Sequence, residues 1–427
     1  MKIFKNTVFV GGGRTRHRFL TWNNPFDFFM YTACGLMLVS FIYIMFHNGE
    51  PIRSLLWSGP TVGIFPDFFE AVKDATRPNP YDERAIYPAF AYFLLYWVSK
   101  FIPYDCTNWP EISLTREGIA TVVIFFLIIT TCVCYLAGNF LKLHGGKALF
   151  LSICFICSPG YIYMAERGNV VILSVLFVMF FLYYYDSKNK ILQELSLVSL
   201  ACAVCMKLYP VFMGIELLLE KQYKKAMRCI FYGVIVFVLP FTFYEGVGEI
   251  PHLISNILYL SKETKVDERG FGYGYKIDIS NFSRAIENYS GIHISFTMLM
   301  CIACICMAIV LFTLKENWKR IYVLTLFLTI IPSFSWIYNA QYFIIPLTFF
   351  FKDNKKMDIE TMIYCIMFLL IMVSAPFGFV METLPGACKI SVSTVLIHLG
   401  MWGILMGLLG ESVAVIIQRC VNAIRYK

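Results

Sequence analysis

The sequence predicts an all-α polytopic membrane protein that crosses a bilayer about 11–12 times, since one crossing takes about 20 mostly apolar residues. Of its 427 residues, 58% are hydrophobic and 17% are aromatic. The mean hydropathy is +0.66, far above that of soluble domains. Apolar stretches recur from Phe26 almost to the C-terminus, so lipid rather than water is the main solvent of this chain.

Hydropathy and turn signals place the helices along the chain. They are expected near residues 26–46, 114–138, 148–165, 169–185, 195–206, 209–219, 229–245, 293–314, 321–337, 340–351, 360–376 and 390–418. Residues 85–102 instead indicate an aromatic, amphipathic helix that lies at the membrane interface. The short runs 195–206 and 209–219 meet at Lys207 and Pro210, and a broken pair of this kind usually lines a cavity.

The basic residues predict the orientation in the membrane. When the helices alternate in direction, the basic clusters of the short loops fall on the same side as the N-terminus, at residues 142–147, 188–190, 221–228, 315–320, 352–356 and 419–427. The positive-inside rule makes this side the cytoplasm, so both termini are expected there. The opposite side receives the two longest hydrophilic segments, 47–113 and 246–292, and function is expected on these external loops.

The composition argues against several classes of site. The net charge is +8, but the basic residues are scattered rather than gathered in one stripe, so no nucleic-acid binding is expected. The sequence GGGR at residues 11–14 lacks the Lys and Ser/Thr of a phosphate loop. Most of the 15 cysteines lie in apolar runs, where they act as small buried hydrophobes, so neither a metal nor another cofactor is expected. Cys106 and Cys388 fall in predicted external loops and could form a disulfide.

The first chemical signal is Asp67, which lies between Phe65, Pro66, Phe68 and Phe69 at the start of the first external loop. A carboxylate held in such a partly desolvated site can act as a general base on a sugar hydroxyl. The alternative is structural, because Pro66 and Asp67 could open a helix whose first turn favours an acidic residue.

The second signal is a pair of polar interruptions between apolar stretches. Glu166, Arg167 and Asn169 lie in the sequence ERGN, and Lys207 precedes Tyr209 at the junction of the two short helices. Arg167 and the amides that open the next helix could bind phosphate, although ERGN could equally be an ordinary turn. A lysine at this depth requires an anionic partner, which is either Glu166 or a lipid phosphate.

The third signal is the stretch PSFSWIYNAQYFIIP at residues 332–346, which places Trp336, Tyr338 and Asn339 at the external end of a crossing. Tyrosine and tryptophan at this depth usually form an aromatic belt. Hydrogen-bonding and ring-stacking groups in one run would also suit a sugar, so these residues are candidate substrate contacts.

In order along the chain, these pieces resemble glycosyltransferase family 87, polytopic enzymes of the GT-C class that use polyprenyl-phosphate sugars. The resemblance rests on the Asp-aromatic start of the external loop, the PY and YP pairs that contain Tyr81 and Tyr87, ERGN, KLYP and PSFSW, and it covers about residues 26–346. One departure is Ile337, where family members often carry His. The resemblance implies a GT-C-like fold and a catalytic base at Asp67, with Tyr81, Tyr87, Tyr209, Glu166 and Asn169 as further candidate substrate contacts.

The resemblance also implies a division of the chain and a reaction. Residues 1–25 form a basic tail, residues 26–351 a catalytic transmembrane module and residues 352–427 the C-terminal helices. Asp67 would deprotonate an acceptor hydroxyl of a glycan or glycolipid that attacks a single sugar, such as a mannose-like hexose, on a polyprenyl-phosphate donor, with inversion. Arg167 and Lys207 are inferred from their charge to bind the donor phosphate. This chemistry suits polysaccharide biosynthesis in the cell envelope, at the plasma membrane.

Two other functions remain open at this point. A lipid-linked polysaccharide polymerase or ligase also has many crossings and a large external loop, but it would transfer a whole glycan from a lipid pyrophosphate. A twelve-helix transporter would instead place its polar groups midway along the helices and repeat its architecture in two halves. In this sequence the polar signals gather at helix ends.

Overall fold

The computed structural model describes residues 24–56, 63–102, 109–266, 273–332, 335–382 and 389–425. Almost all of the secondary structure in these residues is helical, and the strands β1 (Phe379–Glu382) and β2 (Lys389–Ser391) form an antiparallel pair. The all-α class is therefore confirmed. The cysteines within the described ranges are free. Cys106 and Cys388 lie outside these ranges.

The N-terminal half contains the elements that surround the candidate site. In chain order they are α1 (Pro25–Phe46), η1 (Glu50–Ser54), α2 (Pro66–Ala75), η2 (Pro80–Glu83), α3 (Ala89–Ser99), α4 (Trp109–Ile112), α5 (Arg116–Phe140), α6 (Gly146–Ile156), α7 (Pro159–Arg167), α8 (Val171–Tyr184), α9 (Lys190–Met206), η4 (Tyr209–Gly214) and α10 (Ile215–Leu219).

The C-terminal half completes the bundle. Its elements are α11 (Tyr223–Val238), η5 (Leu239–Phe243), η6 (Val247–Glu249), α12 (Ile250–Val266), η7 (Tyr273–Tyr275), α13 (Ile279–Ser290), α14 (Phe296–Thr313), α15 (Asn317–Ile330), η8 (Ile337–Phe343), α16 (Ile344–Asp353), α17 (Ile359–Met372) and α18 (Val392–Arg425).

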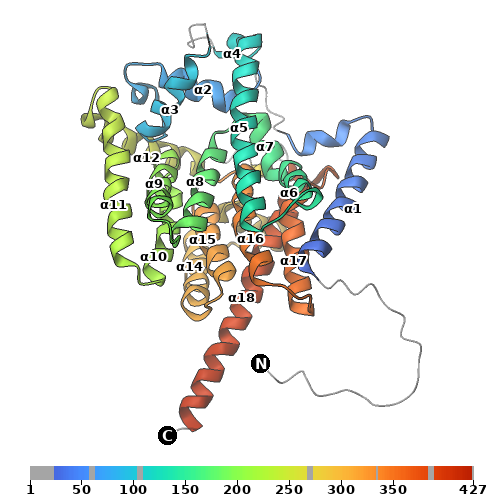
Figure 1. Cartoon of the computed structure of the whole chain (residues 1–427). Helices are drawn as coiled ribbons and strands as arrows, with labels where there is room; N and C mark the ends of the chain where they lie inside the picture. The colour runs from blue at the N-terminus through green and yellow to red at the C-terminus, as the bar shows by residue number, and fades with distance from the viewer. Residues whose placement is uncertain are drawn as a thin grey trace.

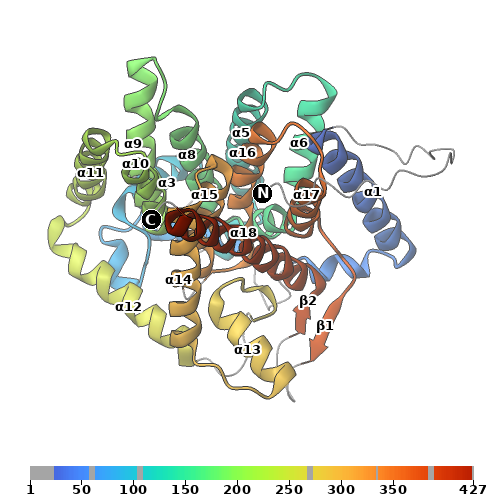
Figure 2. The ribbon, with the colours of Figure 1, turned by 90° about the horizontal axis from the view of Figure 1, so that it is seen from below.

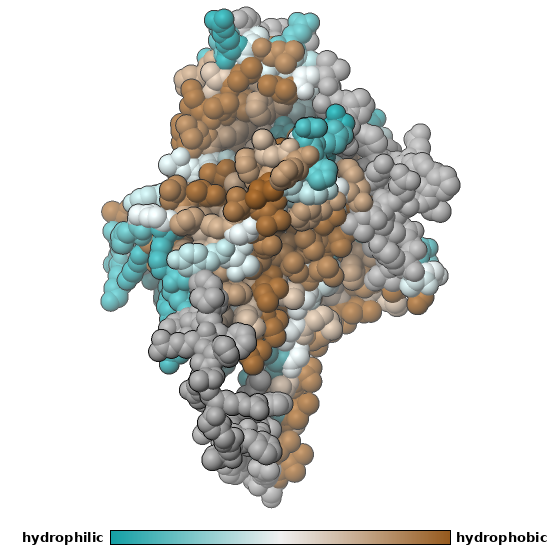
Figure 3. Space-filling model, turned by 90° about the vertical axis from the view of Figure 1, so that its right-hand side faces the viewer, coloured by the Kyte–Doolittle hydropathy of each residue, from teal (hydrophilic) through white to brown (hydrophobic). Residues whose placement is uncertain are grey.

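The helices pack into a bundle whose two ends differ (Figure 1). Helices α2, α3 and α4 lie at one end, and α18 projects from the other end. Seen from below, α18 crosses the middle of the bundle, while α12 and α13 lie at its edge (Figure 2). The face shown in Figure 3 is largely hydrophobic through its middle, as expected for a surface that contacts lipid chains.

Five of the described helices are long and apolar enough to cross a bilayer, and the bent pair α6–α7 would make a sixth span. The five are α1, α5, α14, α18 and the continuous helical stretch Tyr223–Phe243. Shorter apolar helices, such as α8 and α17, complete the bundle. The molecule is thus a polytopic membrane protein.

Three expected helices differ from the observed ones. The helix expected at residues 148–165 is two helices, bent by 61° at a break, because Ser158 caps α7 and Pro159 occupies its first turn. The helix expected at 321–337 ends at Ile330. The interfacial helix expected at 85–102 is the shorter α3, which follows Pro88. The expected break at Lys207–Pro210 is confirmed, since α9 ends at Met206 and η4 begins at Tyr209.

Candidate active site

The helix α2 positions Asp67 by an unusual start. Phe65 is its N-cap residue and has a left-handed backbone, with φ +52°, which is uncommon for a bulky residue. Pro66 opens the helix, and no side chain caps it. Asp67 lies in the first turn of this helix, as the structural alternative expects, and its carboxylate also has partners outside the helix.

Those partners come from the ERGN sequence at the end of α7. Arg167 forms an ion pair with the Oδ1 atom of Asp67, and the side-chain amide of Asn169 donates a hydrogen bond to Oδ2 over 2.8 Å. The side chains of Asp67 and Arg167 retain 16% and 20% of their exposure. A carboxylate held in this way is placed to accept a proton from a substrate hydroxyl.

Gly168 explains why ERGN can approach α2 so closely. It ends α7 in the left-handed conformation, with φ +68°. A Cβ atom at this position would lie 2.8 Å from Cβ of Phe65 and 2.9 Å from Cβ of Phe68. Only glycine satisfies both the backbone and the contact, so the glycine between Arg167 and Asn169 allows both to reach Asp67.

Lys207 lies beside this carboxylate, in the break between α9 and η4. Its ammonium is 4.4 Å from the ring centroid of Tyr338, and it interacts electrostatically with Asp67. In the described parts of the chain no ion pair joins Lys207 to a carboxylate. Glu166, one of the two partners expected for Lys207 from the sequence, interacts with Arg167; the other is a lipid phosphate.

Aromatic residues form one wall around these charged groups. The ring of Tyr163 lies 6.2 Å from those of Trp336 and Tyr338. The phenol of Tyr87 interacts with both Asp67 and Asn169, and Tyr209 interacts with Tyr87 and Tyr338. Of the sequence-derived candidates, the structure thus gathers Asp67, Glu166, Arg167, Asn169, Lys207, Tyr87, Tyr209, Trp336 and Tyr338. Tyr163 is an addition that apolar patterning alone did not distinguish.

Two candidates contact other parts of the protein. Tyr81 is buried, stacks on Phe241 with 5.6 Å between ring centroids, and donates to the carbonyl of Tyr87 over 3.2 Å. Asn339 is also buried and donates to the hydroxyl of Ser335 over 2.8 Å. Both therefore support the site from outside rather than facing Asp67.

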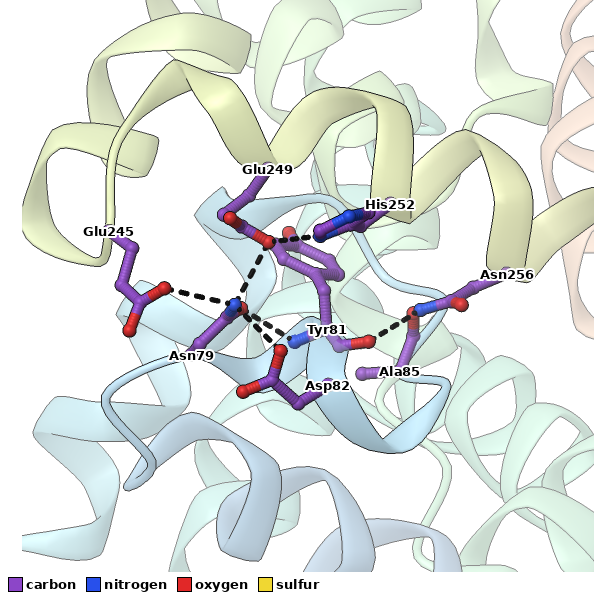
Figure 4. Close-up of polar contacts among 8 residues, drawn as sticks. All are labelled: Asn79, Tyr81, Asp82, Ala85, Glu245, Glu249, His252 and Asn256. Carbon is purple, nitrogen blue, oxygen red and sulfur yellow. Dashed lines mark hydrogen bonds and ion pairs between the residues drawn. The ribbon is translucent and has the colours of Figure 1, made fainter.

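A polar cluster beside the site joins η2 to α12 (Figure 4). Asn79 donates toward carboxylate oxygens of Asp82, Glu245 and Glu249 at 3.0, 3.3 and 2.9 Å. Asn256 donates to the carbonyl oxygens of Tyr81 and Ala85 at 2.9 and 3.1 Å. Sequence patterns did not identify Asn79 and Asn256, because their contacts join segments far apart in the chain.

The arrangement combines a carboxylate with two cations. Asp67 can take a proton, while Arg167 and Lys207 can neutralise an anionic leaving group. Tyr87, Trp336 and Tyr338 present hydroxyl groups and ring faces of the kind that bind sugars. Together these groups suit transfer of a sugar from an anionic carrier.

Comparisons with known proteins agree with this chemistry. No curated protein and no solved structure matches the chain. The family model of glycosyltransferase family 87 matches residues 86–314, which is more than half of the chain and includes Arg167, Asn169 and Lys207. Asp67 and Trp336 lie outside the matched range. The chain belongs to glycosyltransferase family 87 and is a glycosyltransferase of the GT-C type.

Proposed function

We propose that this glycosyltransferase moves a single sugar, a mannose-like hexose, from a polyprenyl-phosphate donor to a glycan or glycolipid acceptor, with inversion at the anomeric carbon. The observation that supports this most is the contact of Asp67 with Arg167 and Asn169, next to Lys207. A base and two cations within one site provide the groups that such a displacement needs.

The proposed reaction accounts for every proton and electron pair with Asp67, Arg167 and Lys207 as the only protein groups. The acceptor oxygen attacks the anomeric carbon while Asp67 accepts the hydroxyl proton. The bond between the anomeric carbon and the phosphate oxygen breaks, and the lipid phosphate departs with the electron pair. Charge on this phosphate grows as the bond breaks, so Arg167 and Lys207 stabilise the transition state more than the ground state.

Arg167 and Lys207 divide the binding of the phosphate between them. The guanidinium of Arg167 can bind a phosphate through donors that do not face Asp67. Lys207 is half-buried and lies against the ring of Tyr338, so its ammonium is only weakly solvated. An anionic ligand that replaces the lost hydration of this ammonium should therefore bind it more strongly than it would bind an exposed lysine.

The sugar contacts follow from the aromatic wall. Tyr87 would hydrogen-bond a sugar hydroxyl near Asp67, and Trp336 and Tyr338 would offer ring faces to the sugar. Residues 26–351 would form the catalytic module, while residues 352–427 would supply supporting helices. We propose that the site lies on the non-cytoplasmic face of the plasma membrane and both termini in the cytoplasm, because the basic clusters of the sequence fall on the side of the N-terminus when the helices alternate in direction.

The test uses the purified full-length chain in lipid nanodiscs. Polyprenyl-phosphate mannose and polyprenyl-phosphate glucose are each supplied with a glycolipid extract, and products are identified by mass spectrometry. Transfer of one hexose without any nucleotide sugar supports the proposal. Transfer only of preassembled glycans from a lipid pyrophosphate, or uptake of free sugar by proteoliposomes without product, would overturn it.

A further inference from the structure

We infer that Asn79 and Asn256 are positioning residues, which hold Tyr87 against Asp67 by fastening the turn before it to α12. This inference rests on the proposed role of the Asp67 site. Residues 79–85 precede the segment matched by the family model, whereas Asn256 lies within it; Asn79 and Asn256 together form what we call the clamp.

Asn256 fixes the turn at both ends (Figure 4). Its amide donates to the carbonyl of Tyr81 at 2.9 Å and to that of Ala85 at 3.1 Å. Between these carbonyls Arg84 has a left-handed backbone, with φ +65°, which costs free energy for a residue other than glycine. The two bonds from α12 therefore stabilise a turn that its own sequence does not favour.

The fixed turn leads directly to Tyr87. The hydroxyl of Tyr81 donates to the carbonyl of Tyr87 over 3.2 Å, and the amide of Tyr87 donates to the hydroxyl of Tyr92 over 3.2 Å. Both backbone groups of Tyr87 are thus held by tyrosines. Its phenol interacts with Asn169 and Asp67.

Asn79 fastens the start of the same turn. Its Oδ1 atom accepts from the amide of Tyr81 over 3.0 Å, which fixes the orientation of its side chain. Its two amide hydrogens then face three carboxylates, from Asp82, Glu245 and Glu249. A neutral donor at this position is required, because a fourth carboxylate would repel the other three.

A double-mutant cycle tests whether the clamp acts through Tyr87. Asn256→Ala and Tyr87→Phe are made singly and together, with Ser255→Ala as a control on an exposed neighbour. Each change is expected to lower kcat about 10-fold, the value of one or two hydrogen bonds, and Asn256→Ala is expected to change the donor KM no more than Tyr87→Phe does. The double variant is expected to be no slower than the worse single variant, and Ser255→Ala to be silent.

The contrary outcomes are distinct. If both single changes lower kcat and their effects multiply, Asn256 does not act through Tyr87 and the clamp is overturned, while the role of Asp67 stands. If Tyr87→Phe is silent, both the clamp and the role of Tyr87 fail.

Asn79→Asp provides a second test that keeps side-chain shape. Its activity relative to the wild type should rise toward acidic pH as the carboxylates are protonated, and a constant ratio across pH would contradict the clamp.

A second and independent inference concerns the end of α18, residues 412–425, which projects from the bundle (Figure 1). An ion pair between Glu411 and Lys319 holds α18 against α15 just before this segment begins. Beyond it, Val413, Ile416, Ile417, Val421 and Ile424 are between 40% and 75% exposed. Figure 3 shows hydrophobic residues along this end of the helix.

These apolar residues form one broad stripe. At about 100° per residue, positions 413, 416, 417, 420, 421 and 424 lie within about 140° of each other. Gln418, Arg419 and Asn422 lie on the opposite side together with Val415, and the guanidinium of Arg419 donates to the carbonyl of Thr313 over 3.5 Å. Residues 412–425 include no acidic residue. The stripe is wider than the narrow seam of a coiled coil, and a basic opposite side is typical of a helix that lies on an anionic membrane.

The chain also provides a bend point at the base of the projection. A Cβ atom on Gly410 would meet nothing within 4 Å, and the hydroxyl of Ser412 donates to the carbonyl of Leu408 over 2.9 Å. Glycine and back-bonded serine are common causes of helix bending. We therefore propose that residues 412–425 bind the anionic lipid surface of the bilayer that the bundle spans.

The rate of trypsin cleavage after Arg419 tests whether residues 412–425 bind the lipid surface. The full chain is placed in nanodiscs made of phosphatidylcholine alone, or of phosphatidylcholine with the anionic lipid phosphatidylglycerol. Binding of residues 412–425 to the membrane is expected to slow release of the peptide that follows Arg419 about 10-fold in the anionic nanodiscs. Trypsin cleaves only the detached form of this segment, and membrane binding lowers the population of that form. Ile417→Ser with Val421→Ser should restore fast cleavage, whereas Gln418→Ser should not. Equal protection from trypsin in both lipid compositions would overturn the proposal and indicate that another part of the same chain covers residues 412–425. Protection that rises with protein concentration would overturn it in favour of a second copy.

Discussion

The side-chain NH2 group of Asn169 donates a hydrogen bond of 2.8 Å to Asp67, while its side-chain oxygen, Oδ1, accepts a hydrogen bond from the backbone amide of Val171 over 3.1 Å. The second bond prevents the amide of Asn169 from flipping, so its NH2 group must face Asp67. With Arg167 on the other carboxylate oxygen, Asp67 cannot rotate freely. The carboxylate is therefore held in one orientation before substrate arrives, as the proposed proton transfer requires.

Replacement of Asn169 should separate orientation from charge. Asn169→Ala removes one hydrogen bond to a charged group and is expected to lower kcat/KM about 10- to 100-fold. Asn169→Asp should cost more, because a second carboxylate would face Asp67. The measurement is kcat/KM with melting temperatures alongside. Equal activity of the wild type and Asn169→Asp would rule out this orienting role.

Gly168→Ala tests the close approach of α7 to α2. The new methyl group would meet Phe65 and Phe68 at under 3.0 Å, and overpacking of this kind costs about 1–3 kcal/mol. Gly291 is a matched control, since it has the same φ of +68° and open space around it. Chemical unfolding in detergent should show a larger loss for Gly168→Ala than for Gly291→Ala. Equal losses would mean that only the backbone conformation matters.

Lys207→Met keeps the length and apolar stem of the side chain while removing its charge. We expect the donor KM to rise about 10-fold or more and the fold to survive, because a hydrogen bond to a charged phosphate is worth about 1.5–3 kcal/mol. Lys207→Arg should retain part of the affinity. Titration of donor lipid into the purified variants provides the measurement, and an unchanged donor KM in Lys207→Met would exclude a phosphate role.

Asp74, on α2, predicts a pH dependence of stability. Burial raises the pKa of Asp74 to about 7, so the folded state binds a proton that the unfolded state has lost above pH about 4. Its contribution to stability is therefore highest at acidic pH and decreases as the pH rises to about 7, by up to about 4 kcal/mol. Asp74→Asn should melt higher than the wild type at pH 8, and the difference should shrink toward pH 5. A difference that is constant with pH would contradict this.

The sequence predicts the class of the fold and much of the site, because both depend on local signals. Long apolar runs identify the bundle, and Pro210 marks the break beside Lys207. Charged residues between apolar stretches indicate Asp67, Arg167 and Lys207, since such residues are costly in a membrane unless they serve a purpose.

The remainder depends on contacts that no local pattern encodes. The end of α15 at Ile330 and the bend at Pro159 replace continuous helices, although Ser158 before Pro159 is a recognisable helix start. The sequence suggests Asn169 as a substrate contact, and only the structure shows that its amide donates to Asp67. Asn79 and Asn256 are separated by most of the N-terminal half, so only the folded chain shows that they secure the same turn.

The most direct test of the account is the turnover of Asp67→Asn with a polyprenyl-phosphate hexose and a glycolipid acceptor. Asparagine keeps the shape and the contact with Arg167 but cannot accept the proton. The account expects a loss of turnover of about 100- to 10,000-fold, with donor binding retained. Turnover equal to that of the wild type, in a protein with the same melting temperature, would contradict the role of Asp67 as the catalytic base.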